Sequence, residues 1–286
     1  MGALAMKKKI RQQTLNVVVI AIVLLIFLPI FLMLPSMFKD RYEIFSYPWR
    51  FLPIHWHIDN FRRIAFLQYT SIGINFFRSL AVTSLVAAIA LVLGLAVNMT
   101  AAFAFARLEF PGKRILWALI ISTMFIPAIT IWFTSVRVAT LLGLLDTMAV
   151  LIIPGLAAAY NIFFFRQFYL GFPRELDEAA RIDGARTFQI FTTIYIPMSK
   201  TPMVIIGAMI FMGYYNSYLW PILVISHQRQ DLYQMMYVIR SLFGHAPTIG
   251  YGAVLAATFI SLIPPMIVFT IVQRYIREGI ALSGLK

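Results

Sequence analysis

Long apolar runs, separated by shorter polar stretches, make up most of the chain. A helix needs about 20 residues to cross a hydrocarbon core about 30 Å thick, because each residue rises about 1.5 Å. A segment in lipid must satisfy its own backbone hydrogen bonds, so each run that is long enough predicts a membrane helix. Six runs reach this length: 15–37, 79–106, 115–136, 148–170, 203–225 and 251–273.

The pattern therefore predicts an all-α, polytopic membrane protein with six transmembrane helices. We divide the chain into a first helix with an outer interfacial segment (1–74), a core of five helices (75–273) and a tail (274–286). The outer segment is amphipathic and rich in aromatic residues, which is typical of a segment that lies along a membrane interface. A polar loop at 174–200, here called the charged loop, divides the core.

Composition supports this class. Hydrophobic residues make up 61% of the 286 positions and charged residues only 12%, whereas a soluble domain has about 25% charged residues. The basic residues behind the net charge of +13 gather at the ends of apolar runs, where they set orientation rather than bind nucleic acid. The first apolar stretch exceeds the 7–15 residues of a signal core, so we expect a retained helix. There is no cysteine, which excludes disulfides and thiol chemistry.

The distribution of lysine and arginine predicts the orientation. With the N-terminus inside, fifteen of the twenty-four basic residues lie on the inner side and nine on the outer side. Cytoplasmic loops carry an excess of basic residues, so both termini are expected to be cytoplasmic. The charged loop is then cytoplasmic as well.

The charged loop predicts two short helices joined by a turn. Glu175, Asp177 and Glu178 favour a helix N-terminus, and Asp177 stands four residues before Arg181, which favours a surface ion pair. Gly184 is expected to adopt the left-handed conformation that ends the first helix. Thr187 is expected to cap a second helix with Phe188, Phe191 and Ile194 at helical spacing, closed by Pro197. Any polar connector could share this helical pattern, which alone does not decide a function.

A longer match does point to a function. The stretch "EAARIDGARTFQIFTTIYIPMSKTP" (178–202) closely resembles the EAA signature of permease subunits in binding-protein-dependent ABC importers. Ten positions stand at the spacing of that family: Glu178, Ala179, Ala180, Asp183, Gly184, Ala185, Phe188, Ile194, Pro197 and Pro202. The stretches "FMGYYNSYLWPILV" (211–224) and "IVQRYIREGI" (271–280) resemble the carbohydrate-type branch, similar to maltose and multiple-sugar permeases. The final "ALSGLK" departs from the usual ending of that branch.

The resemblance implies a type I ABC importer permease in a bacterial inner membrane. It implies a second, similar permease as partner, two ATPase subunits and an external solute-binding protein. Nine residues would couple the chain to the ATPase: Glu178, Ala179, Ala180, Asp183, Gly184, Ala185, Phe188, Ile194 and Pro197. Glu178 would be the anchoring carboxylate and Gly184 the hinge. The implied mechanism is alternating access driven by ATP.

The rest of the sequence offers little chemistry of its own. No phosphate-binding Gly-x4-Gly-Lys-Ser/Thr motif occurs, so ATP and Mg are expected on the partner ATPase, with no cofactor and no metal on this chain. We therefore expect a non-catalytic subunit. Aromatic rings with hydrogen-bonding edges suit a sugar, although an aromatic belt at the interface explains part of the pattern. The candidate pathway residues are Tyr214, Tyr215, Asn216, Tyr218 and Trp220.

Three alternatives stay open. The same machinery could import an anionic saccharide or a glycerol-phosphate-type solute. A carrier or channel without an ATPase is a second alternative, but no carboxylate lies deep within a run, as ion-coupled carriers commonly require. A membrane enzyme is more distant, since no set of nucleophile and base or of metal ligands stands out.

Overall fold

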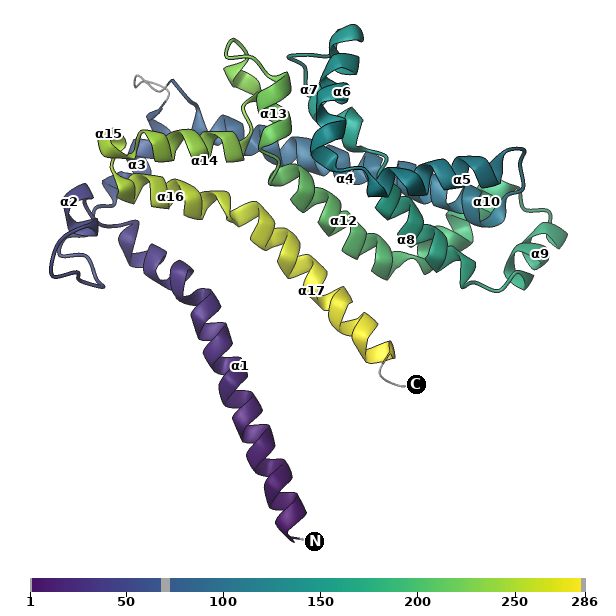
Figure 1. Cartoon of the computed structure of the whole chain (residues 1–286), viewed down its shortest axis with the longest axis horizontal. Coiled ribbons are helices and arrows are strands. Elements are labelled where there is room, and N and C mark those ends of the chain that lie inside the picture. Colours follow the sequence, from purple (N-terminus) through teal and green to yellow (C-terminus); the bar gives the residue numbers. More distant parts are fainter. Residues whose placement is uncertain (1, 68–72, 284–286) are drawn as a thin grey trace. The chain divides into compact units, whose positions relative to one another are not determined.

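The computed structural model describes residues 2–67 and 73–283, and within these ranges every regular element is a helix (Figure 1). The predicted all-α class is confirmed. The chain separates into two compact units. Unit 1 comprises residues Met1–Gly73 and Ser241–Ile260, and unit 2 comprises Ile74–Arg240 and Ser261–Lys286.

Unit 1 begins with the long helix α1 (Gly2–Ser36), whose most apolar 18-residue window is 0% buried within the described structure, while Ser36 at its end is buried. An apolar helix without protein neighbours is stable in lipid, so this exposure fits a membrane span. The connection after it carries the short helices α2 (Arg41–Ile44) and α3 (Asp59–Ala65). Unit 1 also holds α15 (Ala246–Ile249) and most of α16 (Tyr251–Ser261).

A buried polar cluster holds the outer part of unit 1 together. The ammonium group of Lys39 donates to the carbonyl of Arg50 and lies 4.6 Å from the centre of the Trp49 ring. The buried amide of Asn60 donates to the carbonyls of Met37 (2.9 Å) and Lys39 (3.0 Å). These contacts satisfy groups that would otherwise be costly to bury, so the segment is folded rather than merely adsorbed to an interface.

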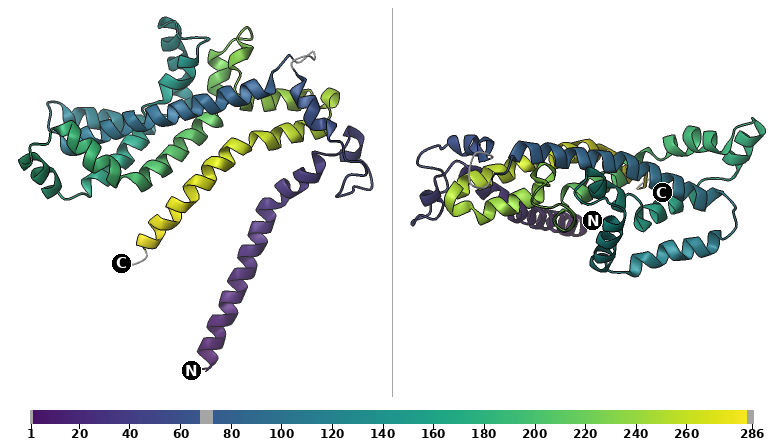
Figure 2. Two further views of the ribbon diagram at one scale, coloured as in Figure 1. Left: turned by 180° about the vertical axis from the view of Figure 1, so that it is seen from behind. Right: turned by 90° about the horizontal axis from the view of Figure 1, so that it is seen from above.

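In unit 2, the long helix α4 (Phe76–Arg107) is the central element. Helices α8 (Ala159–Leu170) and α12 (Lys200–Tyr215) pack along it, and α17 (Ile263–Ser283) packs against α12 (Figures 1 and 2). Small residues permit the close contact, since a Cβ at Gly94 of α4 would lie 3.4 Å from the Ile210 side chain of α12. The remaining elements are α5 (Lys113–Ser122), η2 (Thr123–Phe125), α6 (Ala128–Leu141), α7 (Met148–Ile152), η3 (Ile153–Gly155), α9 (Glu175–Ile182), α10 (Thr187–Ile190), a π-helical turn (Phe191–Tyr195), α11 (Ile196–Met198), α13 (Leu219–Val224), η5 (Gln230–Leu232) and α14 (Met235–Gly244).

The described ranges contain three helical stretches that are long and apolar enough to cross a membrane: Arg11–Ser36, Phe76–Arg107 and Tyr251–Tyr275. Three bent helix pairs bring the number to six if each counts as one span: Lys113–Phe125 with Ile129–Leu141, Met148–Gly155 with Ala159–Leu170, and Thr187–Met198 with Lys200–Tyr215. A polytopic membrane protein is thus confirmed, and the prolines within the apolar runs, Pro127, Pro154 and Pro221 among them, predict kinks in these spans.

Three predicted runs are not continuous helices, and the run 148–170 bends by 45° between Gly155 and Ala159. The run 115–136 breaks before Pro127, because the residue before a proline is driven toward extended backbone and Ile126 adopts φ −86° and ψ 125°. The run 203–225 ends at Tyr215 and restarts as α13. Pro221 lies in the first turn of α13, where its missing N–H costs nothing; within one continuous helix it would have removed a hydrogen bond.

The last predicted span also extends further than expected. Helix α17 runs to Ser283, so most of the predicted tail 274–286 is helical. The final three residues of that tail, and residues 68–72 of the outer segment, lie outside the described ranges. The functional division at residues 74 and 273 stays a prediction.

Candidate functional site

The charged loop folds as two helical arms joined at a glycine. Helix α9 ends at Ile182, and the amide of Ala185 donates to the carbonyl of Ala180 (2.9 Å). Gly184 adopts φ +81°, so the predicted left-handed glycine is confirmed. The second arm differs in detail from the prediction. Arg186, not Thr187, is the N-cap, with its backbone N–H donating to the Gln189 side chain (2.8 Å).

The second arm has an unusual turn. Residues Phe191–Tyr195 form a π-helical turn just before Pro197, and the helical run ends at Met198, one residue beyond the predicted end. Proline has no N–H to donate to the preceding turn, which favours a local change of hydrogen-bond register. The π turn brings both Phe191 and Tyr195 into the interior, where they are 6% and 0% exposed.

Asp177 joins the two arms to the membrane core. Its carboxylate accepts a hydrogen bond from the Tyr195 hydroxyl (2.8 Å) and lies 3.6 Å from the Arg107 guanidinium at the end of α4. Arg107 also donates to the carbonyl of Phe172 (2.6 Å). No ion pair joins Asp177 to Arg181 in the described structure, so the predicted surface pair is wrong. Asp177 points inward and meets a charge supplied by another helix.

An aromatic cluster surrounds the Tyr195 ring. Its centroid lies 4.8 Å from that of Phe103 on α4, 5.2 Å from that of Tyr169 on α8 and 5.3 Å from that of Phe172. Aromatic pairs at this separation add to the stabilisation from burial. A displacement of the charged loop therefore meets rigid contacts with both α4 and α8.

The opposite face of the charged loop is exposed within the part of the chain that the structure describes. Glu178 and Ala179 are exposed, and two large apolar side chains lie open beside them: Ile182 is 86% exposed and Phe188 71% exposed. Asp183, Gly184 and Pro197 are also exposed. Ala180, Ala185 and Ile194 instead pack partly against the core, so the nine predicted coupling residues divide between an outer and an inner face.

A second candidate region lies where the helix pair Met148–Gly155 and Ala159–Leu170 bends by 45°. Side chains from other helices satisfy the backbone groups left free by this break. The buried amide of Asn98 donates to the carbonyl of Leu156 (2.7 Å) and accepts from the N–H of Ala158 (2.9 Å). Tyr214 donates to Ile152 (2.7 Å), and Trp220 donates to Val150 (2.9 Å). Broken helices in transporters are tolerated where they line a cavity.

A hollow of about 410 Å³ lies beside this break. Of the five predicted pathway residues, Tyr214 and Trp220 line it. Tyr215, Asn216 and Tyr218 do not line it: Tyr215 is fully buried and donates to the carbonyl of Ser261 (2.6 Å), and Asn216 is exposed. Three polar residues that the sequence analysis did not single out also line the hollow, namely Ser135, Asn161 and Ser217. Asn98 and Asn161 are amides within apolar runs, a signal that could have identified this region.

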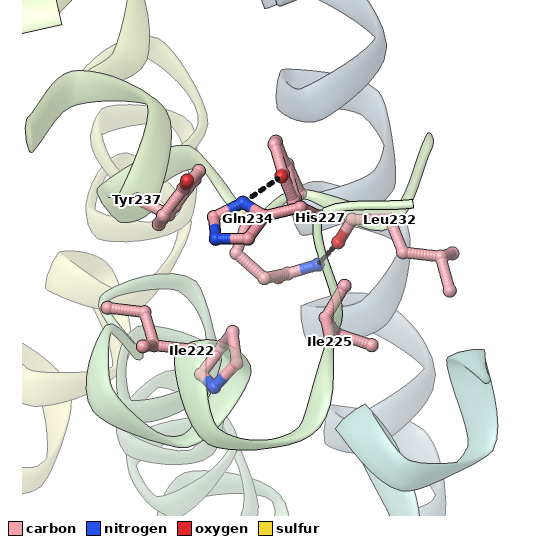
Figure 3. Close-up of a pocket in the computed structure, with 8 residues that line it drawn as sticks. Ile222, Ile225, His227, Leu232, Gln234 and Tyr237 are labelled. Atoms are coloured by element: carbon pink, nitrogen blue, oxygen red, sulfur yellow. Dashed lines mark hydrogen bonds between the residues drawn. The ribbon is translucent and has the colours of Figure 1, made fainter. Parts of the chain in front are cut away.

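The connection between α13 and α14 forms a smaller cavity. It measures about 60 Å³, against about 410 Å³ for the hollow beside the helix break. Figure 3 shows the Gln234 amide directed at the Leu232 carbonyl. The His227 ring nitrogen Nδ1 lies 3.1 Å from the Tyr233 hydroxyl. Burial raises the pKa of Tyr233 to about 12, so its hydroxyl keeps its proton.

Ion pairs fix the same connection to the rest of unit 2. Arg229 donates to both carboxylate oxygens of Asp231 (2.9 and 3.0 Å), and Arg78 on α4 lies 3.6 Å from this carboxylate. The hydrogen bonds from Arg229 hold the pKa of Asp231 below its usual range. Arg229 also donates to the carbonyl of Asp146 (2.7 Å). The connection is thus an ordered structure.

Comparisons with known proteins agree with this architecture. Residues 94–281 match the family model described as the binding-protein-dependent transport system inner membrane component. The chain is 31% identical over 274 residues to the sn-glycerol-3-phosphate transport system permease protein UgpE of Escherichia coli O1:K1, with 94% of each chain covered. It is 33% identical over 270 residues to the protein of the same name from Yersinia enterocolitica, covering 93% of this chain and 94% of the relative.

A solved structure shares the fold. One chain in the crystal structure of a bacterial ABC transporter involved in the import of the acidic polysaccharide alginate matches with a TM-score of 0.77. The match covers 92% of this chain and 95% of that chain at 24% identity, so it supports the fold alone. The extent of the family match and the identity to the curated relatives decide the classification: this chain belongs to the binding-protein-dependent transport system inner membrane components, the permease subunits of ABC importers.

Proposed function

We propose that this permease imports a sugar or a small sugar-related solute through alternating access driven by a partner ATPase. Coupling to the ATPase is supported by the two different faces of the charged loop, one packed against the core and one exposed. Its inner face is fixed to α4 and α8 through Asp177 and Tyr195, while Ile182 and Phe188 are exposed on its outer face. Exposed apolar side chains beside charged groups are typical of a surface that another protein covers.

The ATPase is the partner proposed for this outer face. Glu178 would meet a basic group of the ATPase, and Gly184 would let the two arms of the charged loop change their angle. Closure of the ATPase dimer on ATP would push the charged loop, and the contacts of Tyr195 with Phe103 and Tyr169 would pass the displacement to α4 and α8. ATP and Mg would bind to the ATPase and not to this chain.

The further partners follow from the same role. A second permease would complete the pathway, with two different permeases forming a heterodimer, and an external solute-binding protein would deliver the solute. The orientation proposed for this arrangement places the charged loop and both termini in the cytoplasm, as the distribution of basic residues predicts.

Two solute classes are candidates. A neutral sugar or oligosaccharide agrees with the branch that the sequence resembles. A glycerol-phosphate-type solute is the second candidate, favoured by the similarity to permeases named for sn-glycerol-3-phosphate. The chain also shares a fold with a transporter of an acidic polysaccharide, so the fold is compatible with an anionic solute.

Co-purification tests the proposed coupling. The tagged chain is extracted from its native membrane in mild detergent, and the wild type is compared with Glu178→Ala and with Glu175→Ala as a matched control on α9. We expect the wild type and the control to bring down an ATPase and a second permease, and Glu178→Ala to lose the ATPase. A wild-type chain that purifies alone would favour a carrier without an ATPase. Retention of the ATPase by Glu178→Ala would remove Glu178 from the proposed contact.

A further inference from the structure

We propose that the amide of Asn161, together with the hydroxyls of Ser135 and Ser217, binds an uncharged, hydroxyl-bearing part of the solute during its passage. The inference rests on the proposed function and deepens it, because it identifies which part of the solute this chain contacts. Any anionic group of the solute would be bound elsewhere in the complex.

The burial of Asn161 carries the argument. Asn161 lies on α8, is only 8% exposed and lines the hollow of about 410 Å³. Within the described part of the chain, its side-chain amide has no hydrogen-bond partner. In the described structure the fully buried side-chain atoms without a partner are Arg107 Nε and Tyr169 Oη, so the Asn161 amide itself faces the open space of the hollow. A buried amide that opens into a hollow without a protein partner is suited to a partner that arrives from outside.

Asn98 provides the contrast within the same region. It is also a buried amide, but its amide group is used by backbone atoms of residues 94, 156 and 158. The donors of Tyr214 and Trp220 are likewise used by the carbonyls of Ile152 and Val150. These three side chains support the break in the helix and have little capacity left for a solute. The free hydrogen-bonding groups of the hollow are therefore those of Asn161, Ser135 and Ser217.

The absence of charged side chains from the lining of the hollow indicates which part of the solute binds there. The residues that line the hollow include aromatic rings, namely Trp132, Tyr214 and Trp220, but no lysine, arginine, aspartate or glutamate. An anion would lose its hydration there without a compensating cation, which is expensive. A hydroxyl-rich group can instead exchange its hydrogen bonds with water for bonds to the amide and hydroxyls, while its C–H faces stack on the rings. The hollow thus matches a sugar ring or a glycerol moiety rather than a phosphate or carboxylate.

The first experiment needs no knowledge of the solute. Because the chain contains no cysteine, Ser135→Cys and Ser217→Cys each introduce its only thiol. The complete transporter in lipid vesicles is treated with charged methanethiosulfonate reagents, and modification of this chain is measured by mass spectrometry. We expect both thiols to react, with rates that differ several-fold between the nucleotide-free and the ATP-vanadate states. Thiols that are unreactive in both states would overturn the proposal, because the hollow would then lie outside the aqueous pathway.

The second experiment tests the chemistry. Uptake of maltose and of glycerol 3-phosphate is measured for Asn161→Leu, which removes the hydrogen bonds at similar size, and for Asn161→Asp, which keeps an acceptor and adds a charge. Gln167→Leu, exposed and on the same helix, is the matched control. For whichever probe the wild type transports, we expect Asn161→Leu to lower uptake about tenfold, the loss expected for one hydrogen bond. Gln167→Leu should behave as the wild type, and unchanged uptake by Asn161→Leu would overturn the role of the amide.

The aspartate variant separates the two parts of the proposal. If the anionic group lies elsewhere, Asn161→Asp should affect uptake of glycerol 3-phosphate and maltose to a similar extent. A loss confined to glycerol 3-phosphate would place the phosphate at Asn161 and overturn the exclusion of anions. If the wild type transports neither probe, the proposed solute class fails, and thiol reactivity alone decides whether the hollow belongs to the pathway. Absence of an ATPase from the purified wild-type transporter would instead show that the proposed function itself is wrong.

Discussion

The hydroxyl of Tyr195 donates a 2.8 Å hydrogen bond to the carboxylate of Asp177, and so joins the second arm of the charged loop to the first. Arg107 lies 3.6 Å from the same carboxylate, and its side chain is only 6% exposed. The charged loop is therefore held from its inner side by a nearly buried ion pair, while the outer side stays free for a partner.

The first prediction concerns this ion pair. Asp177→Asn should destabilise the chain by about 3 kcal/mol, because removal of one partner leaves the other charge buried and uncompensated. Thermal unfolding of the purified permease in detergent measures the effect. Glu175→Gln, an exposed carboxylate on the same helix, is the control and should unfold like the wild type. The double variant Arg107→Met/Asp177→Leu should lose less stability than the sum of the losses of Arg107→Met and Asp177→Leu, and strict additivity would contradict a coupled pair.

The second prediction concerns the exposed apolar side chains. Ile182→Ser and Phe188→Ser should weaken binding of the ATPase, since residues at the centre of an interface typically contribute about 1–4 kcal/mol. Neither change should lower the unfolding temperature, because the two side chains are 86% and 71% exposed. Ile190 is 1% exposed, so Ile190→Ser should instead lower the unfolding temperature of the chain. A pull-down of the ATPase alongside an unfolding curve distinguishes the two effects. Full ATPase binding by both exposed-site variants would remove this face from the contact.

The third prediction concerns Asn98. Asn98→Leu keeps a similar volume but leaves the carbonyl of Leu156 and the N–H of Ala158 without their side-chain partner. Each unsatisfied group costs about 1–3 kcal/mol, so we expect a clear fall in the unfolding temperature. The exposed amide of Asn216 offers a control, and Asn216→Leu should leave the unfolding temperature near that of the wild type. A stable Asn98→Leu variant would mean that the break at residues 156–158 is satisfied in another way.

Much of the fold could be predicted from the sequence, because hydrophobicity and length decide where a helix can cross lipid. The runs around α1 and α4 correspond closely to continuous helices. The breaks were harder to predict, since a proline within an apolar run can kink a helix, start one or interrupt one. Pro127 follows an interruption and Pro221 lies in the first turn of a new helix, and only packing against neighbours decides between these outcomes.

The candidate sites show the same limit. The turn at Gly184 could be predicted because a helix end needs a residue that tolerates positive φ. The partner of Asp177 could not be predicted, because Arg107 is distant in the sequence and the local spacing favoured Arg181. Asn98 and Asn161 are both amides within apolar runs, but only their neighbours in space show that one supports the backbone and the other opens into a hollow.

The last prediction concerns the contact between Gly155 and Tyr214. A Cβ at position 155 would lie 2.6 Å from the Tyr214 hydroxyl oxygen, too close for two non-bonded atoms, so Gly155→Ala must displace the phenol. The displacement breaks the 2.7 Å hydrogen bond to Ile152, a loss of about 1 kcal/mol. Replacement of glycine by alanine also reduces the entropy of the unfolded chain, which stabilises by about 0.4–1 kcal/mol. The two effects have opposite signs, so the single variant should show a net loss smaller than that of Tyr214→Phe.

A double-mutant cycle separates these two effects. In a Tyr214→Phe background the 2.6 Å contact with the hydroxyl is absent and only the ring carbon Cζ, at 3.1 Å, stays close, so adding Gly155→Ala should destabilise less in thermal unfolding than it does in the wild type. The coupling between the two positions should then be about 1 kcal/mol, within the range seen for residues in direct contact. Strict additivity would contradict the contact.

Because both residues line the hollow, Gly155→Ala should also change the reactivity of a thiol at Ser217→Cys. Gly143→Ala is no substitute as a control, since φ at that position is +65° and alanine would be strained there. Gly213 lies on α12 and has open space around an added Cβ, so Gly213→Ala provides the matched comparison for thermal unfolding.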